Sequence, residues 1–482
     1  MKEASQQEAF DIIVIGAGSG GLNIAGFMNR TGFKVLLVDK KEEGIGGDCL
    51  NYGCVPSKAL IHIARQMREA RGARRFGMNV EGSADMKKVS NYIREKKEVI
   101  RKHENKSYFE SRGMTVIIGA ATFASNNSIA VNGNIYSAKR ILLATGSRPR
   151  TLHIEGMEGA TILTNESLFD LEILPKKLLV IGGGPIGIEL GQAMSHLGSD
   201  VSIVVKEDKI LPREDAALSS VLQSEMEKDG VTFYFNSSVK KITEKKYALL
   251  QINSEERTIE FDAILVAVGR ELNKEHLDLE KAGIELNEKG GIQVNEYLET
   301  TNKNVLLCGD IVGQHQFTHA AELHAALIIR NFFIPPFIAR ILPFLKKKLN
   351  TDHLSWVTYT TPELATFGIS EHDLMGRNTQ YKVLEQDFED DDRAIVDETT
   401  NGKMKLFVSK KGVLLGGTMV SQNAGELVQE LILVQSQNMN VSALFSKIYP
   451  YPTAARINKK AVSKLYIEKL TPIVKKLMKL LY

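Results

Sequence analysis

Two cysteines separated by four residues are the side chains of this chain best suited to chemistry. Cys49 and Cys54 lie in the string Gly-Gly-Asp-Cys-Leu-Asn-Tyr-Gly-Cys-Val-Pro-Ser-Lys, residues 46–58. On an ideal helix, residues five apart lie about 140° apart around the axis, so a bond between the two sulfurs requires a distorted turn. A pair at this spacing alone fits a zinc site or coincidence better than a redox pair, so the surrounding sequence decides.

The number of cysteines favours a chemical role for any pair. The chain has 482 residues and 3 cysteines, too few for a disulfide scaffold, so the fold depends on burial, as expected for a reducing compartment. Cys308 ends an apolar strand, and we expect it to be a small buried residue that takes no part in the reaction. We expect no resident metal ion.

Composition excludes several classes of protein. The chain is 43% hydrophobic, which excludes a disordered or collagen-like chain, and its length suggests about three domains. The 61 basic and 58 acidic residues nearly cancel, so the chain has no strong positive electrostatic field to attract nucleic acid. With one Trp, it also offers no obvious aromatic surface on which bases could stack. The first residues fit neither a signal peptide nor a membrane span, so we expect a cytoplasmic protein.

The elements that would position the cysteines begin with a dinucleotide-binding fingerprint. An apolar run at 11–15 predicts a buried parallel strand, followed by a glycine turn, a helix and a second strand at 35–39. Gly16 would form the tight turn, Gly18 would allow close approach of a pyrophosphate, and Gly21 would allow helix packing. Asp39, at the end of the second strand, would accept from a ribose hydroxyl.

The fingerprint recurs 166 residues later, from Gly16 to Gly182. A strand at 178–181 leads into Gly182, Gly184 and Gly187, and another strand follows at 201–205. A duplicated mononucleotide-binding fold is the economical interpretation, and it implies two dinucleotides. The predicted fold class is α/β, with two Rossmann-like domains and a separate strand-rich C-terminal α+β domain beyond Trp356.

The cysteine string and both fingerprints together resemble the class I pyridine nucleotide-disulfide oxidoreductases. This is the flavoprotein family of lipoamide dehydrogenase, glutathione reductase and mercuric reductase. Further motifs in the same order carry the resemblance, at residues 144–149, 266–270, 308–310 and 361–363, with Glu189 after the second fingerprint.

The resemblance implies a homodimer that uses FAD and either NADP or NAD. It divides the chain into an FAD-binding domain with the redox disulfide (1–150), an NAD(P)-binding domain (151–275), a central segment that completes the FAD domain (276–350) and an interface domain used for dimerisation (351–482).

The resemblance also implies roles for individual residues. Cys49 would exchange with substrate, Cys54 would lie against the flavin, and Lys58 would sit beside flavin N5, paired with Glu189. In thiol–disulfide exchange the attacking group is a thiolate. A cysteine near a helix N-terminus and a cation has a lowered pKa, so these positions favour a thiolate in this pair. The remaining residues expected to bind the two cofactors are Thr145, Gly146, Ser147, Gly269, Asp310, Phe317, Thr318 and His319.

The implied reaction is a relay in which electrons pass from the nicotinamide through the flavin to the cysteine disulfide and then to an acceptor. The acceptor is left open, because the chain departs from the disulfide-reducing pattern His-Pro-Thr-x-x-Glu. Residues 451–456 read Tyr-Pro-Thr-Ala-Ala-Arg, so both the base and its orienting acid are replaced. Tyr451 takes the place of the base and is counted with Cys49, Cys54, Lys58 and Glu189 among the candidate catalytic residues, although a reference pKa near 10 makes it a poor base at neutral pH. Mercuric reductases are similar in having tyrosine here, but they also carry a C-terminal cysteine pair, which this chain lacks.

The coenzyme preference is suggested by the residues after the strand at 201–205. Where family members that use NAD carry a glutamate for the ribose hydroxyls, this chain has Val205, followed by Lys206. A cation suits a 2′-phosphate, so the sequence favours NADP, while Glu207 keeps NAD open.

Two segments have no counterpart in the soluble reductases. Residues 332–349 and 472–482 combine apolar side chains with lysine and arginine, and each reads as a basic amphipathic element. Either could pack on the dimer or lie on a membrane. The leading interpretation, from the resemblance, is an NAD(P)H-dependent flavoprotein reductase of the mercuric reductase-like branch with an unidentified acceptor. The alternatives are an NAD(P)H:quinone flavoprotein bound peripherally to the inner face of a membrane, or a flavin-bearing subunit of a larger complex.

Overall fold

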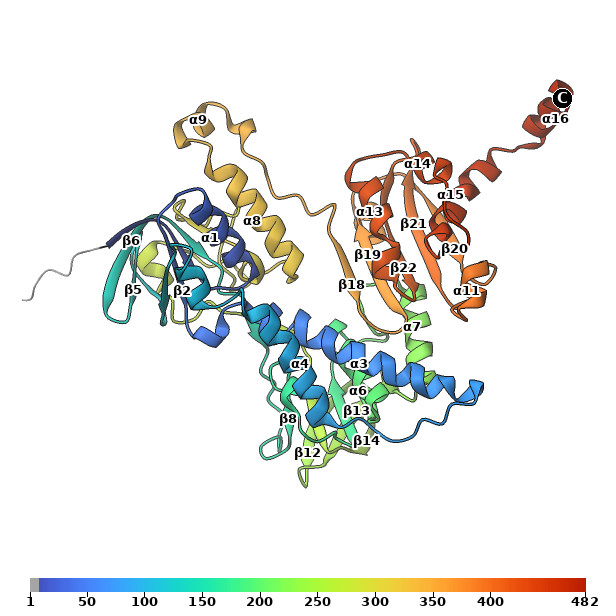
Figure 1. Ribbon diagram of the computed structural model, residues 1–482, viewed down its shortest axis with the longest axis horizontal. Helices are drawn as coiled ribbons and strands as arrows, with labels where there is room; N and C mark the ends of the chain where they lie inside the picture. Colours follow the sequence, from blue (N-terminus) through green and yellow to red (C-terminus); the bar gives the residue numbers. More distant parts are fainter. Residues whose placement is uncertain (1–7) are drawn as a thin grey trace, which may run out of the picture.

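The computed structural model describes residues 8–482 and arranges them in three bodies (Figure 1). Residues 1–7 of the predicted domain 1–150 lie outside the described part. The first body is built on a seven-stranded sheet in which β3, β2, β1 and β6 are neighbours and run parallel. Its strands are β1 (Glu8–Ile15), β2 (Val35–Asp39), β3 (Thr115–Ile118), β4 (Thr122–Ser125), β5 (Ser128–Val131), β6 (Asn134–Leu143) and β17 (Val305–Leu307).

The apolar run predicted as a buried strand is the centre of this sheet. Ile12 and Val14 face one core cluster and Ile13 and Ile15 face the other, and all four are buried. Alternation across a strand with apolar residues on both faces is what a parallel sheet covered on both sides requires. Helices α1 (Ser19–Arg30) and α8 (Thr318–Phe332) pack together over the Ile12 face.

The helix after the cysteine string links the first body to the second. Helix α2 (Gly47–Asn51) carries Cys49, and α3 (Cys54–Gly72) begins at Cys54. Leu60 and Ile61 of α3 are buried in the same core cluster as Ile188 of α6 (Pro185–Leu197), a helix of the second body. Helices α4 (Met86–Arg101) and α5 (Lys106–Glu110) follow α3 in the chain. The start of α3 is thereby held at the junction between the two bodies.

The second body repeats the parallel sheet, in the strand order β11-β10-β9-β15-β8. These strands are β8 (Ile162–Leu163), β9 (Lys177–Ile181), β10 (Asp200–Val204), β11 (Thr232–Tyr234) and β15 (Ala263–Val266), with α7 (Ala216–Lys228) between β10 and β11. A meander of β12 (Ser237–Thr243), β13 (Tyr247–Ile252) and β14 (Glu255–Glu260) adjoins them. The short pair β7 (Ser147–Pro149) and β16 (Arg270–Leu272) connects the two bodies.

The third body is an antiparallel sheet in the order β18-β19-β22-β21-β20 with helices packed on it. Its strands are β18 (Ser355–Thr358), β19 (Glu363–Gly368), β20 (Tyr381–Asp387), β21 (Lys403–Ser409) and β22 (Leu414–Ser421). Its helices are α10 (Glu371–Gly376), α11 (Asp392–Val396), α12 (Ala424–Leu427), α13 (Gln429–Ser436), α14 (Ser442–Ser446), α15 (Arg456–Glu468) and α16 (Pro472–Leu481). The fold class predicted from the sequence is confirmed.

Two helices project outward, one from the first body and one from the third. Figure 1 shows α9 (Pro336–Ile341) at the tip beyond α8 and α16 at the end of the chain, both at the upper edge of the view. Within residues 8–482, no helix combines the length and the apolar character that crossing a membrane would need.

Candidate active site

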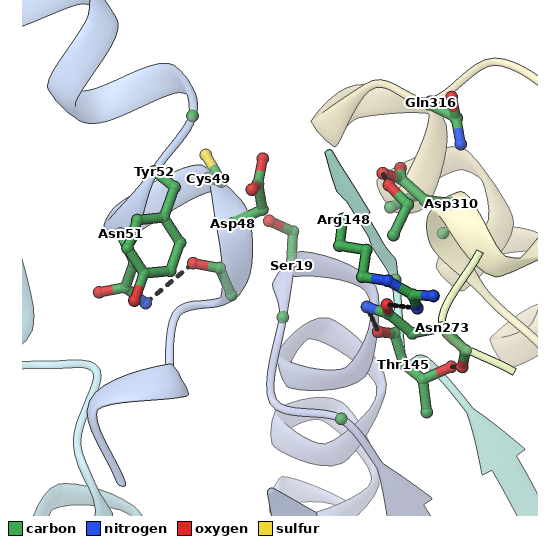
Figure 2. A pocket seen from close by; sticks show the side chains of 18 of the residues that line it. Ser19, Asp48, Cys49, Asn51, Tyr52, Thr145, Arg148, Asn273, Asp310 and Gln316 are labelled. Atoms are coloured by element: carbon green, nitrogen blue, oxygen red, sulfur yellow. Dashed lines mark hydrogen bonds between the residues drawn. The ribbon is translucent and has the colours of Figure 1, made fainter. Parts of the chain in front are cut away.

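A cavity of about 1250 Å³ lies at the carboxyl edge of the first sheet and reaches the junction with the second body. It exceeds the roughly 300–1,000 Å³ of ordinary ligand pockets, as an elongated ligand requires. Its lining comes from the first glycine loop, the cysteine string, the loop after β6 and residues 308–319. Figure 2 shows Asp48 and Cys49 on one side of this cavity and Arg148, Asn273 and Asp310 on the other.

The first glycine loop lies too close to neighbouring backbone to carry a side chain at two of its positions. A Cβ on Gly16, which has φ +105°, would lie 2.3 Å from the Ala144 carbonyl oxygen, and one on Gly21 would lie 2.0 Å from the Gly16 carbonyl oxygen. Glycine is therefore required at both positions. Gly18 precedes α1 and lines the cavity, so its amide and those of the first turn of the helix are placed to meet a phosphate.

Asp39 ends β2 and lines the cavity beside the first glycine loop. Its Oδ2 accepts a hydrogen bond of 2.7 Å from the Ala17 amide, and burial raises the pKa of the carboxyl. The side chain lies beside the glycine loop, as expected for an acceptor of ribose hydroxyls.

Asp310 is the centre of a polar network on the opposite wall. Its Oδ2 accepts from the Ser147 hydroxyl at 2.6 Å, and burial raises the pKa of the carboxyl. Arg270 donates to the same hydroxyl at 2.7 Å and pairs with Asp48 at 3.1 Å. Next to this network, the Thr145 hydroxyl donates to the Asn273 carbonyl oxygen, and Gly146 adopts φ +69°. The structure thus brings Thr145, Gly146, Ser147 and Asp310 together.

The two cysteines are unbonded thiols that face one another and Thr318. The Cys54 sulfur lies 3.3 Å from the Thr318 hydroxyl oxygen. Interaction with the neighbouring Cys49 thiol, with help from Thr318 and the charge of Lys58, lowers the pKa of Cys54 to about 6, although burial opposes the shift. The same interaction, together with burial, raises the pKa of Cys49. The thiolate of the pair is therefore Cys54, the first residue of α3, while Cys49 keeps its proton at neutral pH.

Lys58 and Glu189 form an ion pair across the junction of the first two bodies. Four residues after Cys54, Lys58 lies on the same face of α3, and its Nζ is 2.9 Å from Oε2 of Glu189 on α6. Glu189 also accepts from the Tyr359 amide at 2.9 Å, and the Lys58 ammonium lies 4.4 Å from the centre of the Tyr359 ring. Burial on its own lowers the pKa of Lys58, but the Glu189 carboxylate outweighs it and the net shift is upward.

Three aromatic rings form a stacked wall near the cysteines. The ring of Phe317 is 5.2 Å from that of His319 and 6.1 Å from that of Trp356, with interplanar angles of 7° and 5°. Burial lowers the pKa of His319, so its imidazole is neutral at pH 7. Trp356 is fixed from the far side by Glu214, which accepts from the indole Nε1 at 2.6 Å.

The second glycine loop repeats the geometry of the first. A Cβ on Gly182, at φ +122°, would lie 2.3 Å from the Ala267 carbonyl oxygen, and one on Gly187 would lie 2.2 Å from the Gly182 carbonyl oxygen. A Cβ on Gly184 would meet no protein atom within 4 Å, so the space there is open to a ligand. Gly269 has φ +108° and follows β15 of the same sheet.

The two residues invoked for coenzyme choice differ in exposure. Val205 is fully buried against Gly183, and Lys206 is exposed. Val205 therefore cannot reach a ribose, whereas the Lys206 ammonium is accessible from solvent.

Tyr451 is the one proposed catalytic residue that the structure does not bring to the cavity. It lies in the third body with 67% of its surface exposed, and its hydroxyl donates to Asp392 at 3.1 Å. This hydrogen bond raises the pKa of Tyr451, which makes the phenol a still poorer base. Within one protomer Tyr451 does not line the cavity, so a role in the reaction would require a second protomer.

Several cavity residues were not assigned a role from the sequence. Arg270 appears in the sequence only as the last residue of a short motif, and Asp48 as part of the cysteine string. Tyr359 precedes the Thr-Pro-Glu motif by two residues and could have been found from that proximity. Asn273 and Trp356 carry no sequence signal of their own. Among residues 8–482, no cluster of three or more His, Cys, Asp or Glu side chains is arranged to hold a metal ion.

Comparison with known proteins gives matches over nearly the entire chain. The family model described as pyridine nucleotide-disulphide oxidoreductase matches residues 10–325, and that of the dimerisation domain of the same family matches residues 354–462.

Individual relatives include two kinds of enzyme. The chain is 29% identical to a mercuric reductase of Bacillus cereus over 460 residues, covering 94% of this chain and 71% of that protein. It is 32% identical to a dihydrolipoyl dehydrogenase of Thermus scotoductus, covering 92% of this chain and 95% of that protein. Among solved structures, the HOCl-induced flavoprotein disulfide reductase RclA from Escherichia coli superposes with a TM-score of 0.80 at 25% identity, covering 94% of this chain and 99% of that one.

Proposed function

The chain belongs to the pyridine nucleotide-disulphide oxidoreductase family of FAD-dependent enzymes, and from that premise we propose that it reduces a small-molecule acceptor through Cys49 and Cys54. The observation that carries the proposal is that Cys49 and Cys54 line the large cavity together, with the Cys54 sulfur 3.3 Å from the Thr318 hydroxyl oxygen. The lowered pKa of Cys54 and the raised pKa of Cys49 agree with it. Such a pair holds one thiolate and one proton ready at neutral pH.

The residues around the cavity fit FAD. The glycine loop has no room for side chains at Gly16 and Gly21, and Gly18 and Asp39 are placed for a pyrophosphate and a ribose. Asp310 and Ser147 would hold a hydroxylated chain, and Thr318 lies beside Cys54. When bound, FAD would supply two-electron chemistry between a nicotinamide and the cysteines.

The cysteine step balances as follows. Breaking the Cys49–Cys54 disulfide takes two electrons and one proton, and it leaves the Cys49 thiol and the Cys54 thiolate. Oxidation of the two cysteines passes the two electrons to the acceptor, re-forms the S–S bond and releases the proton. The charge of Lys58 favours the thiolate of Cys54, and the pair with Glu189 fixes the position of that charge.

Lys206 supports NADP as the coenzyme. Val205 is buried and presents no group for a ribose diol, while the exposed Lys206 ammonium suits a 2′-phosphate. The open space at Gly184 suits the pyrophosphate of the same coenzyme.

The acceptor that we favour is a thiophilic metal ion, as the name of the Bacillus cereus relative suggests. Reduction of a disulfide needs an acid–base group that delivers a proton to the leaving thiolate. Tyr451 does not suit that role, because its hydroxyl is hydrogen-bonded to Asp392 and its pKa is raised. A metal ion held by two sulfurs needs ligands and electrons but no such proton. The dimerisation domain supports a homodimer, and we place Tyr451 of one protomer near the cysteines of the other.

A second candidate is a quinone, favoured by the exposed apolar residues of 332–349 and 472–482. A quinone dissolved in a bilayer is reached most readily by an enzyme bound at the bilayer surface.

A stopped-flow screen of the NADPH-reduced enzyme tests the function. Glutathione disulfide, lipoamide, Hg(II), Cu(II) and a soluble quinone are offered in turn, and reoxidation is followed by flavin absorbance. We expect fast reoxidation by the metal ions, abolished in Cys49→Ser and unchanged in Cys308→Ala, whose thiol is buried. If Cys49→Ser retained full activity with every acceptor, direct flavin oxidation would replace the proposed thiol route.

A further inference from the structure

Two segments of the chain expose apolar and basic side chains together and fall outside the two ranges that the family models match. The family models match residues 10–325 and 354–462. The first segment, residues 333–349, lies between the two matched ranges, and the second, residues 467–482, follows them. Helices α9 and α16, which belong to these two segments, both lie at the upper edge of Figure 1. Neither segment lines the cavity.

Helix α16 in the second segment separates its residue types completely. At 100° per residue, six apolar side chains fall within an arc of about 160°, and three lysines fall within an arc of about 100° on the other side. The apolar side chains are Ile473, Val474, Leu477, Met478, Leu480 and Leu481. The lysines are Lys475, Lys476 and Lys479. The helix contains no acidic residue.

The apolar arc of α16 is in contact with water along its entire length. Every residue from 467 to 482 is exposed, and Ile473, Leu480 and Leu481 have 80%, 74% and 81% of their surface accessible. The helix is nevertheless well capped, because the Thr471 hydroxyl accepts from the Val474 amide and Pro472 occupies the first turn. A capped amphipathic helix with no buried residue needs a surface to cover its apolar arc.

The first segment is fixed at its base and exposed at its tip. Phe332 and Phe333 pack edge-on against Phe33, which anchors the segment to the first body. Beyond them, the segment carries three large apolar side chains with about 70% of their surface exposed: Phe337, Ile341 and Phe344.

The structure reduces the free charge of the first segment. Lys346 pairs with Glu299, and Lys348 pairs with Glu296 at 2.7 Å. The charges of Arg340 and Lys347 then remain beside the exposed aromatic tip. The first segment therefore presents mainly exposed apolar side chains, whereas α16 carries most of the unpaired positive charge.

We propose that α16, with the tip of residues 333–349 as a second contact, binds this enzyme to an anionic lipid bilayer. A bilayer interface covers an apolar arc while its acidic headgroups meet the flanking lysines, which matches the charge of both segments. A folded protein partner would have to bring its own acidic rim and apolar groove to two separate projections. The proposal concerns the surface alone and holds for either electron acceptor.

Vesicle flotation of the FAD-loaded, full-length protein tests the proposal. Vesicles of phosphatidylcholine with phosphatidylglycerol are compared with vesicles of phosphatidylcholine alone, at low and near-physiological salt. We expect the protein to float with the anionic vesicles, and to float several-fold less when salt shortens the Debye length from about 30 to about 8 Å. Protein that stays at the bottom of the gradient with anionic vesicles at low salt would overturn the proposal.

Matched variants separate the two contributions to binding. Lys475→Glu with Lys479→Glu, and separately Leu477→Ser with Leu481→Ser, should each weaken binding to anionic vesicles at least tenfold. Lys410→Glu with Lys411→Glu changes the same net charge at an exposed turn of the third body and should leave binding within twofold. All variants should keep flavin content and NADPH turnover with a soluble acceptor, because α16 is remote from the cavity.

The alternative to a bilayer is that a second copy of the chain covers the apolar arc of α16. Sedimentation velocity of the Leu477→Ser, Leu481→Ser variant distinguishes these two possibilities. The proposal predicts a wild-type dimer and a variant that is still a dimer but no longer floats. A variant that dissociates into monomers, or one that floats like wild type, would overturn it.

Discussion

The Lys58 ammonium on α3 and the Glu189 carboxylate on α6 lie 2.9 Å apart, although α3 begins in the first body and α6 belongs to the second. Their pairing therefore depends on how those bodies are held together. Glu189 is buried, and its second oxygen accepts from the Tyr359 amide, so a segment next to the third body also fixes its position. One ion pair is thus positioned by all three parts of the chain.

Loss of the Glu189 charge should slow reduction of the flavin. In Glu189→Gln, Lys58 keeps its charge but loses its charged partner, and we expect the rate of flavin reduction by NADPH to fall about tenfold, equivalent to about 1.4 kcal/mol in the barrier. Stopped-flow absorbance measures this rate. Glu256→Gln, which removes an exposed partner of Lys240, is the matched control and should change nothing. An unchanged rate in Glu189→Gln would show that the pair has no part in electron transfer.

The thiolate of the two-electron-reduced enzyme should titrate near pH 6. The pKa of Cys54 is lowered to about 6, so the thiolate, and its charge-transfer absorbance with the flavin, should be present above that pH and lost below it. Cys49→Ala removes the thiol whose interaction is the largest cause of this shift, so the midpoint, read in this variant with the flavin oxidised, should move upward by at least one pH unit. Cys49→Ser keeps a donor and should move it less. A midpoint that is the same in both variants would contradict the assigned cause.

Two glycines of the second fingerprint should respond differently to alanine. A Cβ on Gly184 meets no protein atom, so Gly184→Ala should leave the melting temperature unchanged while raising the KM for NADPH about tenfold or more. A Cβ on Gly187 would lie 2.2 Å from the Gly182 carbonyl oxygen, so Gly187→Ala should lower the melting temperature by several degrees. Steady-state kinetics and thermal melts measure the two effects. A normal KM in Gly184→Ala would place the coenzyme elsewhere.

Lys206 should determine the coenzyme preference. We expect wild type to use NADPH with a higher kcat/KM than NADH, because a cation can meet the 2′-phosphate and the buried Val205 cannot hold a diol. Lys206→Glu should lower kcat/KM for NADPH about tenfold or more and leave that for NADH equal or higher. The ratio of the two kcat/KM values is the measurement. A wild-type preference for NADH would contradict this role of Lys206 and would favour Glu207 as the residue that binds the ribose hydroxyls.

Much of the fold could be predicted because glycine and β-branched residues mark it directly. The first strand is readable from its apolar run, and Gly16 and Gly182 are readable because only glycine fits their positive φ beside a neighbouring carbonyl. Family membership, inferred from the order of the motifs, is confirmed. The position of β17, which joins the first sheet from residue 305 onward, was expected from the resemblance and not from spacing.

The candidate site was less predictable, because its geometry depends on contacts between distant residues. The split of the thiol pKa values arises from the mutual orientation of Cys49, Cys54 and Thr318, which are up to 269 residues apart. The bond from Tyr451 to Asp392 and the pairs of Lys346 and Lys348 with glutamates are likewise invisible in the local sequence. The roles of the individual site residues, and the domain boundaries, stay predictions.

The central claim is that Cys49 and Cys54 form a disulfide that the nicotinamide coenzyme reduces. Counting free thiols in the denatured protein, before and after anaerobic reduction with NADPH, tests it most directly. Of the three cysteines, the account predicts that only Cys308 reacts in the oxidised enzyme and that all three react after reduction. An equal number of reactive thiols in both states would contradict it.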